Sequence, residues 1–121
     1  MAEVIFNTNL EKIFQGTLRA IGETADALKT EVEQAQVIPK DKGTLEASMT
    51  VDKSQIENGK VKIVVSTPYA RRLYFHPEYR FRKTDNPNAK GKWFEDWLPN
   101  GSKETFAEDT FVSFYKKYAG V

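Results

Sequence analysis

Several residue types that carry chemistry are scarce or missing in this sequence. None of the 121 residues is cysteine, which excludes disulfide bonds, thiol catalysis, iron–sulfur clusters and thiolate zinc sites. The single histidine, His76, leaves no second imidazole for a two-histidine metal site, and no Gly-x-Ser-x-Gly turn accompanies it. Carboxylate neighbours such as Glu95 and Asp96 point in different directions on a helix and do not converge on a substrate. We therefore predict a protein that is not an enzyme and needs no metal or other cofactor.

Long apolar runs are missing as well. The longest are only a few residues, such as residues 63–65, far below the roughly 20 residues that cross a bilayer. The first residues carry an acid, Glu3, where a secretory signal carries basic residues. We expect a cytosolic product without membrane contact. A chain of 121 residues has the size of one ordinary domain, so residues 1–121 are predicted to form a single domain.

The first third of the chain predicts one long amphipathic helix. Apolar side chains recur at three- and four-residue steps on one face over residues 10–35. Thr8 and Glu11 are spaced as in a capping box at a helix start, and Pro39 predicts an end near Gln36. Such a helix is about 40 Å long, which equals or exceeds the diameter of a compact domain of this size. It must therefore kink or overhang.

Two glycines and a regular seam bear on how this helix packs. Gly16 and Gly22 each cost about 1 kcal/mol relative to alanine in an exposed helix interior, so a kink is one outcome. The apolar steps over residues 21–35 alternate between four and three, which is typical of packing at a shallow angle. The partner is either the domain's own sheet or second helix, or, for part of the seam, a neighbouring subunit.

After this helix the hydrophobic period shortens to two. Residues 48–66 alternate on both sides of the pair Asn58-Gly59, a strong signal for a tight hairpin turn. We therefore expect an antiparallel hairpin there. Residues 79–83 alternate too, as a third strand or an extended arm would.

Helical signals return in the second half of the chain. A helical turn is predicted to begin at Pro68, a short helix to cover residues 92–98, and a last helix to begin at Ser102 as its cap. The predicted fold class is α+β: a long N-terminal helix packed on a small antiparallel sheet, with a C-terminal helix. The last helix carries a stripe of aromatic residues: Phe106, Phe111, Phe114, Tyr115 and Tyr118.

Positive charge is concentrated in one segment. The formal net charge is only +1, but residues 69–92 hold seven Lys or Arg against two Asp or Glu. Aromatic residues are interleaved with these charges. Such a segment can bind nucleic acid, with the rings stacking on bases and the charges pairing with phosphates. It can also form a protein interface, in which Arg, Tyr and Trp serve as anchors. We expect a flexible basic loop at about residues 76–92. The interface candidates are Arg71, Arg72, Tyr74, Tyr79, Arg80, Phe81, Arg82, Lys83, Trp93 and Trp97.

Two stretches match a known pattern in the same order. Residues 37–48, Val-Ile-Pro-Lys-Asp-Lys-Gly-Thr-Leu-Glu-Ala-Ser, resemble the Pro-x-Asp-Thr-Gly-x-Leu-x-x-Ser signature of minor capsid, neck or tail-completion proteins of long-tailed double-stranded DNA phages. In that family a long helix precedes the signature, a hairpin follows it, and a Pro-Tyr-Ala element closes the second strand. Lys42 departs from the family's Thr. The matching signature residues are Pro39, Asp41, Gly43, Leu45, Ser48, Pro68 and Tyr69.

Elementary chemistry accounts for the signature without catalysis. Pro39 stops the helix, Asp41 can cap the following turn through its side chain, and Gly43 supplies a backbone angle that other residues resist. Leu45 then returns to the core. Such a reversal locks the helix to the sheet.

The resemblance implies a structural virion protein of the neck, assembled in the host cytoplasm. It implies a homo-oligomeric ring, with a hexamer as one size, between the portal of the filled head and the tail, in contact with other neck, connector or tail proteins. The long helix and the basic aromatic loop are then candidates for the two complementary faces that a ring needs. Basic residues facing the lumen would contact passing DNA by charge alone. The alternative is a small nucleic-acid-binding accessory protein that uses residues 69–92.

Overall fold

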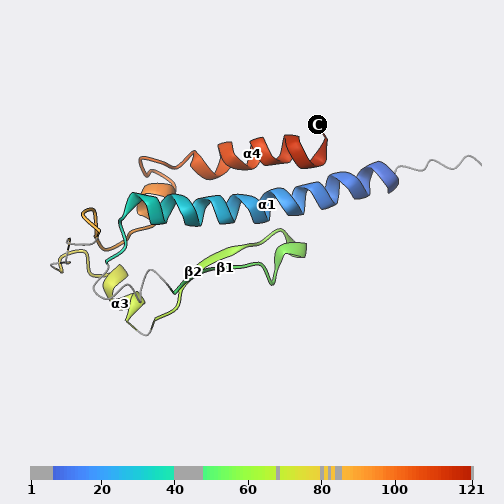
Figure 1. Ribbon diagram of the computed structural model, residues 1–121. Helices are drawn as coiled ribbons and strands as arrows, with labels where there is room; N and C mark the ends of the chain where they lie inside the picture. Colours follow the sequence, from blue (N-terminus) through green and yellow to red (C-terminus); the bar gives the residue numbers. More distant parts are fainter. Residues whose placement is uncertain are drawn as a thin grey trace, which may run out of the picture.

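The computed structural model describes residues 7–39, 48–67, 69–79, 81, 83 and 86–120. Helix α1 (Asn7–Ala35) forms a central rod, with the C-terminal helix α4 (Phe106–Ala119) along one side and a two-stranded hairpin along the other (Figure 1). This arrangement confirms the predicted α+β class, with its long N-terminal helix, small antiparallel sheet and C-terminal helix.

Helix α1 is continuous over 29 residues, about 43 Å, so it overhangs and does not break. Its N-terminal end extends past both α4 and the hairpin (Figure 1). The predicted cap is wrong, because Thr8 already lies inside the helix and the Glu11 carboxylate accepts a hydrogen bond from Gln15 Nε2 at 3.0 Å. The predicted end is confirmed: Gln36 leaves the helix with a φ of 56°.

The glycines of α1 mark close approaches of its neighbours. A Cβ at Gly16 would lie 2.6 Å from the carbonyl oxygen of Tyr118 and 2.7 Å from Cα of Ala119, both backbone atoms of α4. A Cβ at Gly22 would meet only side chains, the nearest being Cδ1 of Ile56 at 3.2 Å. Gly16 therefore lets the two helices touch at that turn.

Strands β1 (Met49–Asp52) and β2 (Lys62–Val65) pair antiparallel, with Met49 opposite Val65, so the hairpin is confirmed. The predicted tight turn is wrong. The strands are joined through the 3-10 helix η1 (Ile56–Asn58), after which Gly59 adopts a φ of 75°. Asn58 belongs to η1, and only Gly59 uses the left-handed geometry that the pair suggested.

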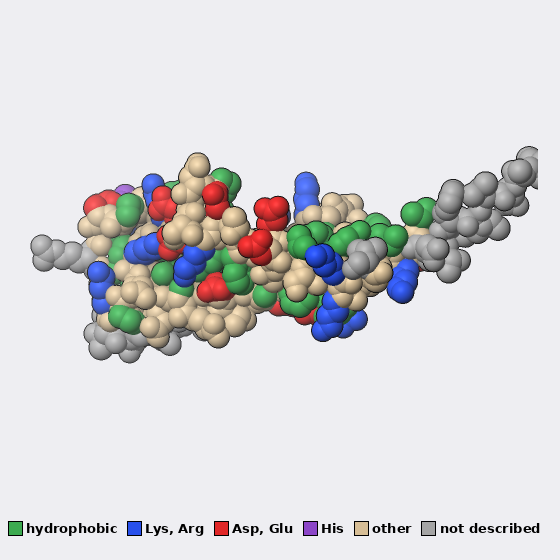
Figure 2. All heavy atoms as spheres, turned by 90° about the horizontal axis from the view of Figure 1, so that it is seen from above, with side chains coloured by type: hydrophobic (Ala, Val, Ile, Leu, Met, Phe, Trp, Pro, Cys, Tyr) green, Lys and Arg blue, Asp and Glu red, His purple; other side chains and the backbone are tan. Residues whose placement is uncertain are grey.

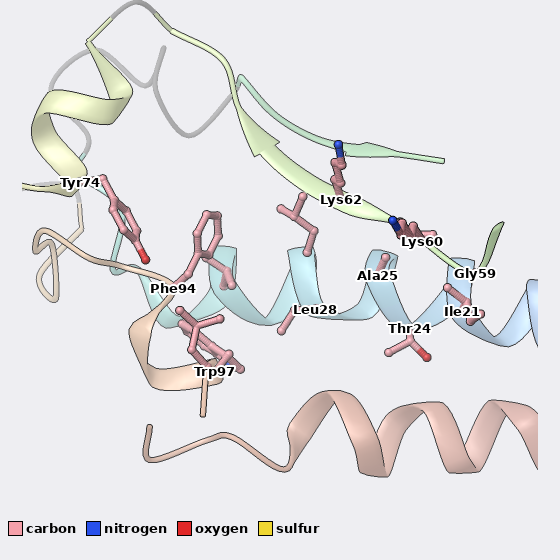
Figure 3. A pocket seen from close by; sticks show the side chains of 14 residues that line it. Ile21, Thr24, Ala25, Leu28, Gly59, Lys60, Lys62, Tyr74, Phe94 and Trp97 are labelled. Atoms are coloured by element: carbon pink, nitrogen blue, oxygen red, sulfur yellow. The ribbon is translucent and has the colours of Figure 1, made fainter. Parts of the chain in front are cut away.

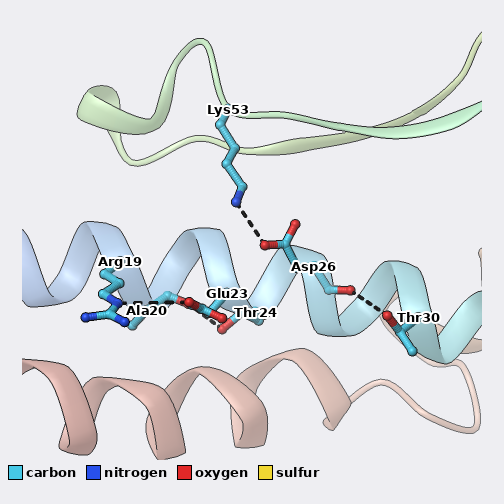
Figure 4. Close-up of polar contacts among 7 residues, drawn as sticks. All are labelled: Arg19, Ala20, Glu23, Thr24, Asp26, Thr30 and Lys53. Carbon is cyan, nitrogen blue, oxygen red and sulfur yellow. Dashed lines mark hydrogen bonds and ion pairs between the residues drawn. The ribbon is translucent and has the colours of Figure 1, made fainter.

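Polar contacts attach the hairpin to α1 and satisfy threonine hydroxyls within the helix (Figure 4). The amino group of Lys53, in the loop after β1, lies 2.9 Å from the Asp26 carboxylate on α1. Both side chains are largely exposed, so this pair contributes at most about 1 kcal/mol. The buried Thr24 hydroxyl donates to the Ala20 carbonyl at 2.7 Å and so has a partner inside the helix.

The rest of the chain adds short helical pieces. Helix α3 (Ala70–Tyr74) and the 3-10 helix η2 (Glu95–Trp97) lie where helical turns were expected. The predicted cap at Ser102 is wrong, since α4 begins after Thr105, which makes no side-chain cap bond among the described residues. Of residues 79–83, the described positions belong to no strand, and the sheet of the described chain has two strands.

The hydrophobic core gathers at the C-terminal end of α1. Trp93 is only 1% exposed and Trp97 only 7%, and both pack with the chain that follows α1, with β1 and with α3. Residues of the predicted basic loop are anchored beside them. The buried Asn86 amide donates to the Ile38 carbonyl at 2.8 Å, and the Lys90 backbone N–H donates to the Val37 carbonyl at 2.9 Å. This stretch therefore closes over the core.

Candidate functional site

An apolar groove of about 640 Å³ runs between α1 and the hairpin (Figure 3). Its floor is the seam of α1 that the sequence predicted, with side chains at steps of four, three and four. The seam therefore lies partly open beneath β2. From α1 the lining residues are Ile21, Thr24, Ala25, Leu28 and Val32; from the hairpin they are Gly59, Lys60, Val61, Lys62 and Ile63; the end near α3 and η2 is lined by Tyr74, Phe94, Trp97 and Leu98.

The rim of the groove is polar on its strand side. Lys60 and Lys62 are exposed on the hairpin side of the groove, and the Lys62 side chain points from β2 away from α1 (Figure 3). At the other end, Leu98 is 48% exposed, and the indole N–H of Trp97 is buried without a hydrogen-bond partner in the described chain.

Aromatic rings close the inner end of the groove. Tyr74 packs edge-on against Trp93, with ring centroids 4.9 Å apart, and lies 6.0 Å from Phe94. Burial and the nearby Glu95 carboxylate raise the pKa of the Tyr74 hydroxyl above its ordinary value, so it stays neutral. A second apolar hollow of about 230 Å³ lies beyond and is also lined by Tyr74 and Phe94. These two rings therefore form part of the wall of both hollows.

The structure divides the predicted interface residues into two groups. Trp93 and Trp97 are buried and Tyr74 is half-buried, and all three pack in the protein's own core. Tyr74 and Trp97 also line the groove, whereas Trp93 does not. Arg71, Arg72, Tyr79 and Lys83 are exposed and Phe81 is partly buried, while Arg80 and Arg82 lie outside the described residues.

The exposed part of this segment forms a basic aromatic surface on and after α3. The Nε of Arg72 lies 3.4 Å from the Tyr79 hydroxyl, and the His76 ring stacks on Tyr79 with centroids 4.7 Å apart. His76 Nδ1 lies 2.7 Å from the Glu78 carboxylate, and this hydrogen bond holds the pKa of Glu78 below its ordinary value. Phe75, 57% exposed, belongs to the same surface and was not among the predicted candidates.

A second apolar surface lies on the overhanging end of α1. Leu10 is 58% exposed and Phe14 is 47% exposed, one helical turn apart. The sequence placed both on the buried face because they continue its apolar spacing. They are exposed because α1 outruns its neighbours, and Figure 2 shows hydrophobic side chains continuing toward this end of the molecule. The one sequence feature that pointed to this surface is the length of the helix, which predicted that part of it would overhang the rest of the domain.

Three signature residues, Pro39, Ser48 and Tyr69, lie at positions that the structure describes. Pro39 is buried after α1, and Tyr69 is 44% exposed and precedes α3. The Ser48 hydroxyl accepts a hydrogen bond from the Ser66 backbone N–H at 3.2 Å. This bond links the segment before β1 to the segment after β2, just beyond the paired strands. The remaining signature positions, Asp41, Gly43, Leu45 and Pro68, lie outside the described residues.

Within the described ranges, no group of three or more His, Asp or Glu side chains is placed to hold a metal ion. None of the helices described is both long and apolar enough to span a membrane. No family model matches the chain, and comparison with characterised proteins and with solved structures yields no match.

Proposed function

We propose that this chain is a structural protein of the phage neck, where it completes the tail or joins the tail to the DNA-filled head. The observation that carries a role in protein assembly is the open apolar groove between α1 and β2. Its apolar floor, lysine rim and aromatic end match the composition of protein interfaces, in which apolar centres are surrounded by polar edges. The phage assignment rests on the resemblance of residues 37–48 and 68–70 to the family signature.

The order of elements supports the same proposal. The family has a long helix, the signature, a hairpin and then the Pro-Tyr-Ala element, and the described chain has α1, the hairpin and then Tyr69 and Ala70 at the start of α3. In this proposal the protein acts in a homo-oligomeric ring, with a hexamer as one size, and is carried in the virion after assembly in the host cytoplasm. Neck, connector and tail proteins are its other partners.

The basic aromatic surface then has a separate task. Arg71 and Arg72 are exposed residues of α3, which lies far along the molecule from the overhanging end of α1 (Figure 1). A surface of this composition can bind a second type of neck protein. It can also contact DNA passing through the neck by charge alone, with no base reading.

Deleting the gene from the phage tests the neck role. We expect filled heads and tails that remain separate in electron micrographs, and a loss of infectious particles. A plasmid copy of the wild-type gene, supplied during infection, should restore both. Joined and infectious particles from the deletion phage would contradict the proposal.

A nucleic-acid-binding accessory protein is the second candidate function, and one observation favours it. Tyr69, Phe75 and Tyr79 are all at least 36% exposed around the exposed Arg71 and Arg72, so rings and charges are available together. This function predicts DNA binding that weakens steeply between about 50 mM and 200 mM salt. Replacing both arginines by alanine should reduce the binding and flatten its salt dependence. Fluorescence anisotropy with single-stranded and duplex DNA measures both; salt-insensitive or absent binding would rule this candidate out.

A further inference from the structure

We propose that the exposed start of α1, carrying Leu10 and Phe14, docks into the groove between α1 and β2 of a second copy of this chain. The inference rests on the proposed self-assembly and deepens it, because it names the two surfaces that meet. The sequence indicated the long helix and the basic aromatic loop as the two faces of the ring contact. In this inference the long helix keeps its role, and the groove takes the place of the loop.

The donor surface has the geometry of a helix that binds in a groove. Leu10 and Phe14 are four residues apart, so their side chains lie on the same face of α1, one above the other. They are 58% and 47% exposed on a rigid helix that outruns its neighbours. Paired apolar side chains at this spacing are the anchors by which amphipathic helices enter hydrophobic grooves.

The groove cannot be filled by the same surface of its own chain. Phe14 lies seven residues before Ile21, the first groove residue of α1, which is about 10 Å along one continuous helix. A rigid helix cannot fold back on its own middle. Leu10 and Phe14 can therefore enter only the groove of another molecule.

The receiving surface matches this donor in chemistry. The groove of about 640 Å³ is lined by aliphatic side chains such as Leu28 and Ile63 and, at one end, by the rings of Tyr74 and Phe94. Apolar side chains in the groove would remove water from both surfaces.

Charge complementarity favours the same pairing. Glu11 is exposed and is the helix-surface neighbour of Phe14, three residues later. The hairpin side of the groove carries the exposed Lys60, so docking brings the Glu11 carboxylate toward its ammonium group. Lys12 does not oppose this, because its amino group lies beside Gly120 at the C-terminal end of α4 in its own copy.

A contact between the start of α1 in one copy and the groove of the next copy can build assemblies larger than a dimer. Each copy offers one donor helix and one groove at different places, which is a head-to-tail interface. Such an interface closes into a ring when its rotation returns to the start. The inferred contact is thus of the type that the proposed ring requires.

Sedimentation velocity of the purified full chain over a concentration series tests the donor surface. Replacing both Leu10 and Phe14 by glutamate should weaken self-association by about 30-fold. The matched control is Val112→Glu on α4, because Val112 is a comparably exposed apolar residue, at 43%. It should leave self-association unchanged. Circular dichroism establishes that each variant is folded, which is expected because all three positions are exposed.

Cysteine cross-linking tests the receiving surface, since the wild-type chain contains no cysteine. Phe14→Cys and Lys60→Cys variants are purified separately, mixed and treated with a short bismaleimide. We expect a cross-linked dimer containing one of each variant. The control mixture pairs Val112→Cys with Lys60→Cys. Equal yields from the two mixtures would overturn the inference.

The outcomes separate this inference from the proposed function. If the wild type self-associates and the glutamate double variant does so equally well, the inference is wrong while ring assembly through another surface stands. If the wild type remains monomeric at about 1 mM, a concentration that detects even very weak contacts, the inference is also wrong. The neck role is then decided by the deletion phage alone.

Discussion

Replacing Gly16 by alanine tests whether α4 needs the bare backbone of α1 at that turn. The added Cβ would lie 2.6 Å from the Tyr118 carbonyl oxygen and 2.7 Å from both N and Cα of Ala119. All three are backbone atoms, so no side-chain rotation relieves the overlap. Helix α4 must shift away from α1.

The expected magnitude follows from two opposing effects. Alanine favours a helix interior over glycine by about 1 kcal/mol, whereas overpacking of this kind costs typically about 1 to 3 kcal/mol. Because the overlap at Gly16 is with backbone, we expect the upper end of that range and a net loss of about 2 kcal/mol. Gly22→Ala is the matched control. Its Cβ would meet only the movable ends of Ile56 and Lys53, at 3.2 Å or more, so the helix gain should survive.

Urea unfolding followed by circular dichroism measures both variants against the wild type. We expect Gly16→Ala to lower the free energy of unfolding and Gly22→Ala to leave it unchanged or raise it slightly. The two variants should differ by about 2 to 3 kcal/mol, or about 10 °C in Tm. A Gly16→Ala protein as stable as Gly22→Ala would refute the close packing of α1 and α4 on which the elongated shape depends.

Three further predictions concern the core and the basic aromatic surface. Trp93→Ala should cost about 3 to 5 kcal/mol in chemical unfolding, because the largest buried side chain of the core is removed. Asn86→Ala should cost about 1 to 3 kcal/mol in the same assay, because the buried Ile38 carbonyl loses its amide donor. His76→Ala should raise the titration midpoint of Glu78 in NMR, because the hydrogen bond that lowers its pKa is lost. Since that pKa is lowered by folding, the stabilisation from Glu78 is present above its unfolded pKa and fades as pH falls through the folded one.

Periodicity predicted the elements well, and Pro39 predicted the end of α1, but the predicted helix caps and the tight turn were wrong. The apolar spacing identified α1, the hairpin and α4, because burying one face of each element requires it. Capping signals are local and short, so they compete with packing. Thr8 lies inside α1, Ser102 does not begin α4, and Asn58 extends a 3-10 helix before Gly59 turns.

The candidate site was only partly predictable. The sequence left two partners open for the seam over residues 21–35, the domain's own elements or, for part of it, a neighbouring subunit. How much of the seam stays exposed depends on where the short hairpin ends, which no local pattern encodes. Tryptophan is common both in protein cores and at protein interfaces, so residue type alone could not decide between these places for Trp93 and Trp97. Their burial is decided by the anchoring of residues 86–92 to the chain after α1, through hydrogen bonds such as Asn86 to Ile38, across 48 positions of sequence.

Immunogold electron microscopy of intact, purified phage particles tests the central claim most directly. An antibody against this chain is applied to wild-type particles, with deletion particles as the control for labelling. The proposed neck role predicts gold at the junction between head and tail. Particles that carry none of the protein, as expected for an accessory protein that binds nucleic acid inside the host, would contradict it.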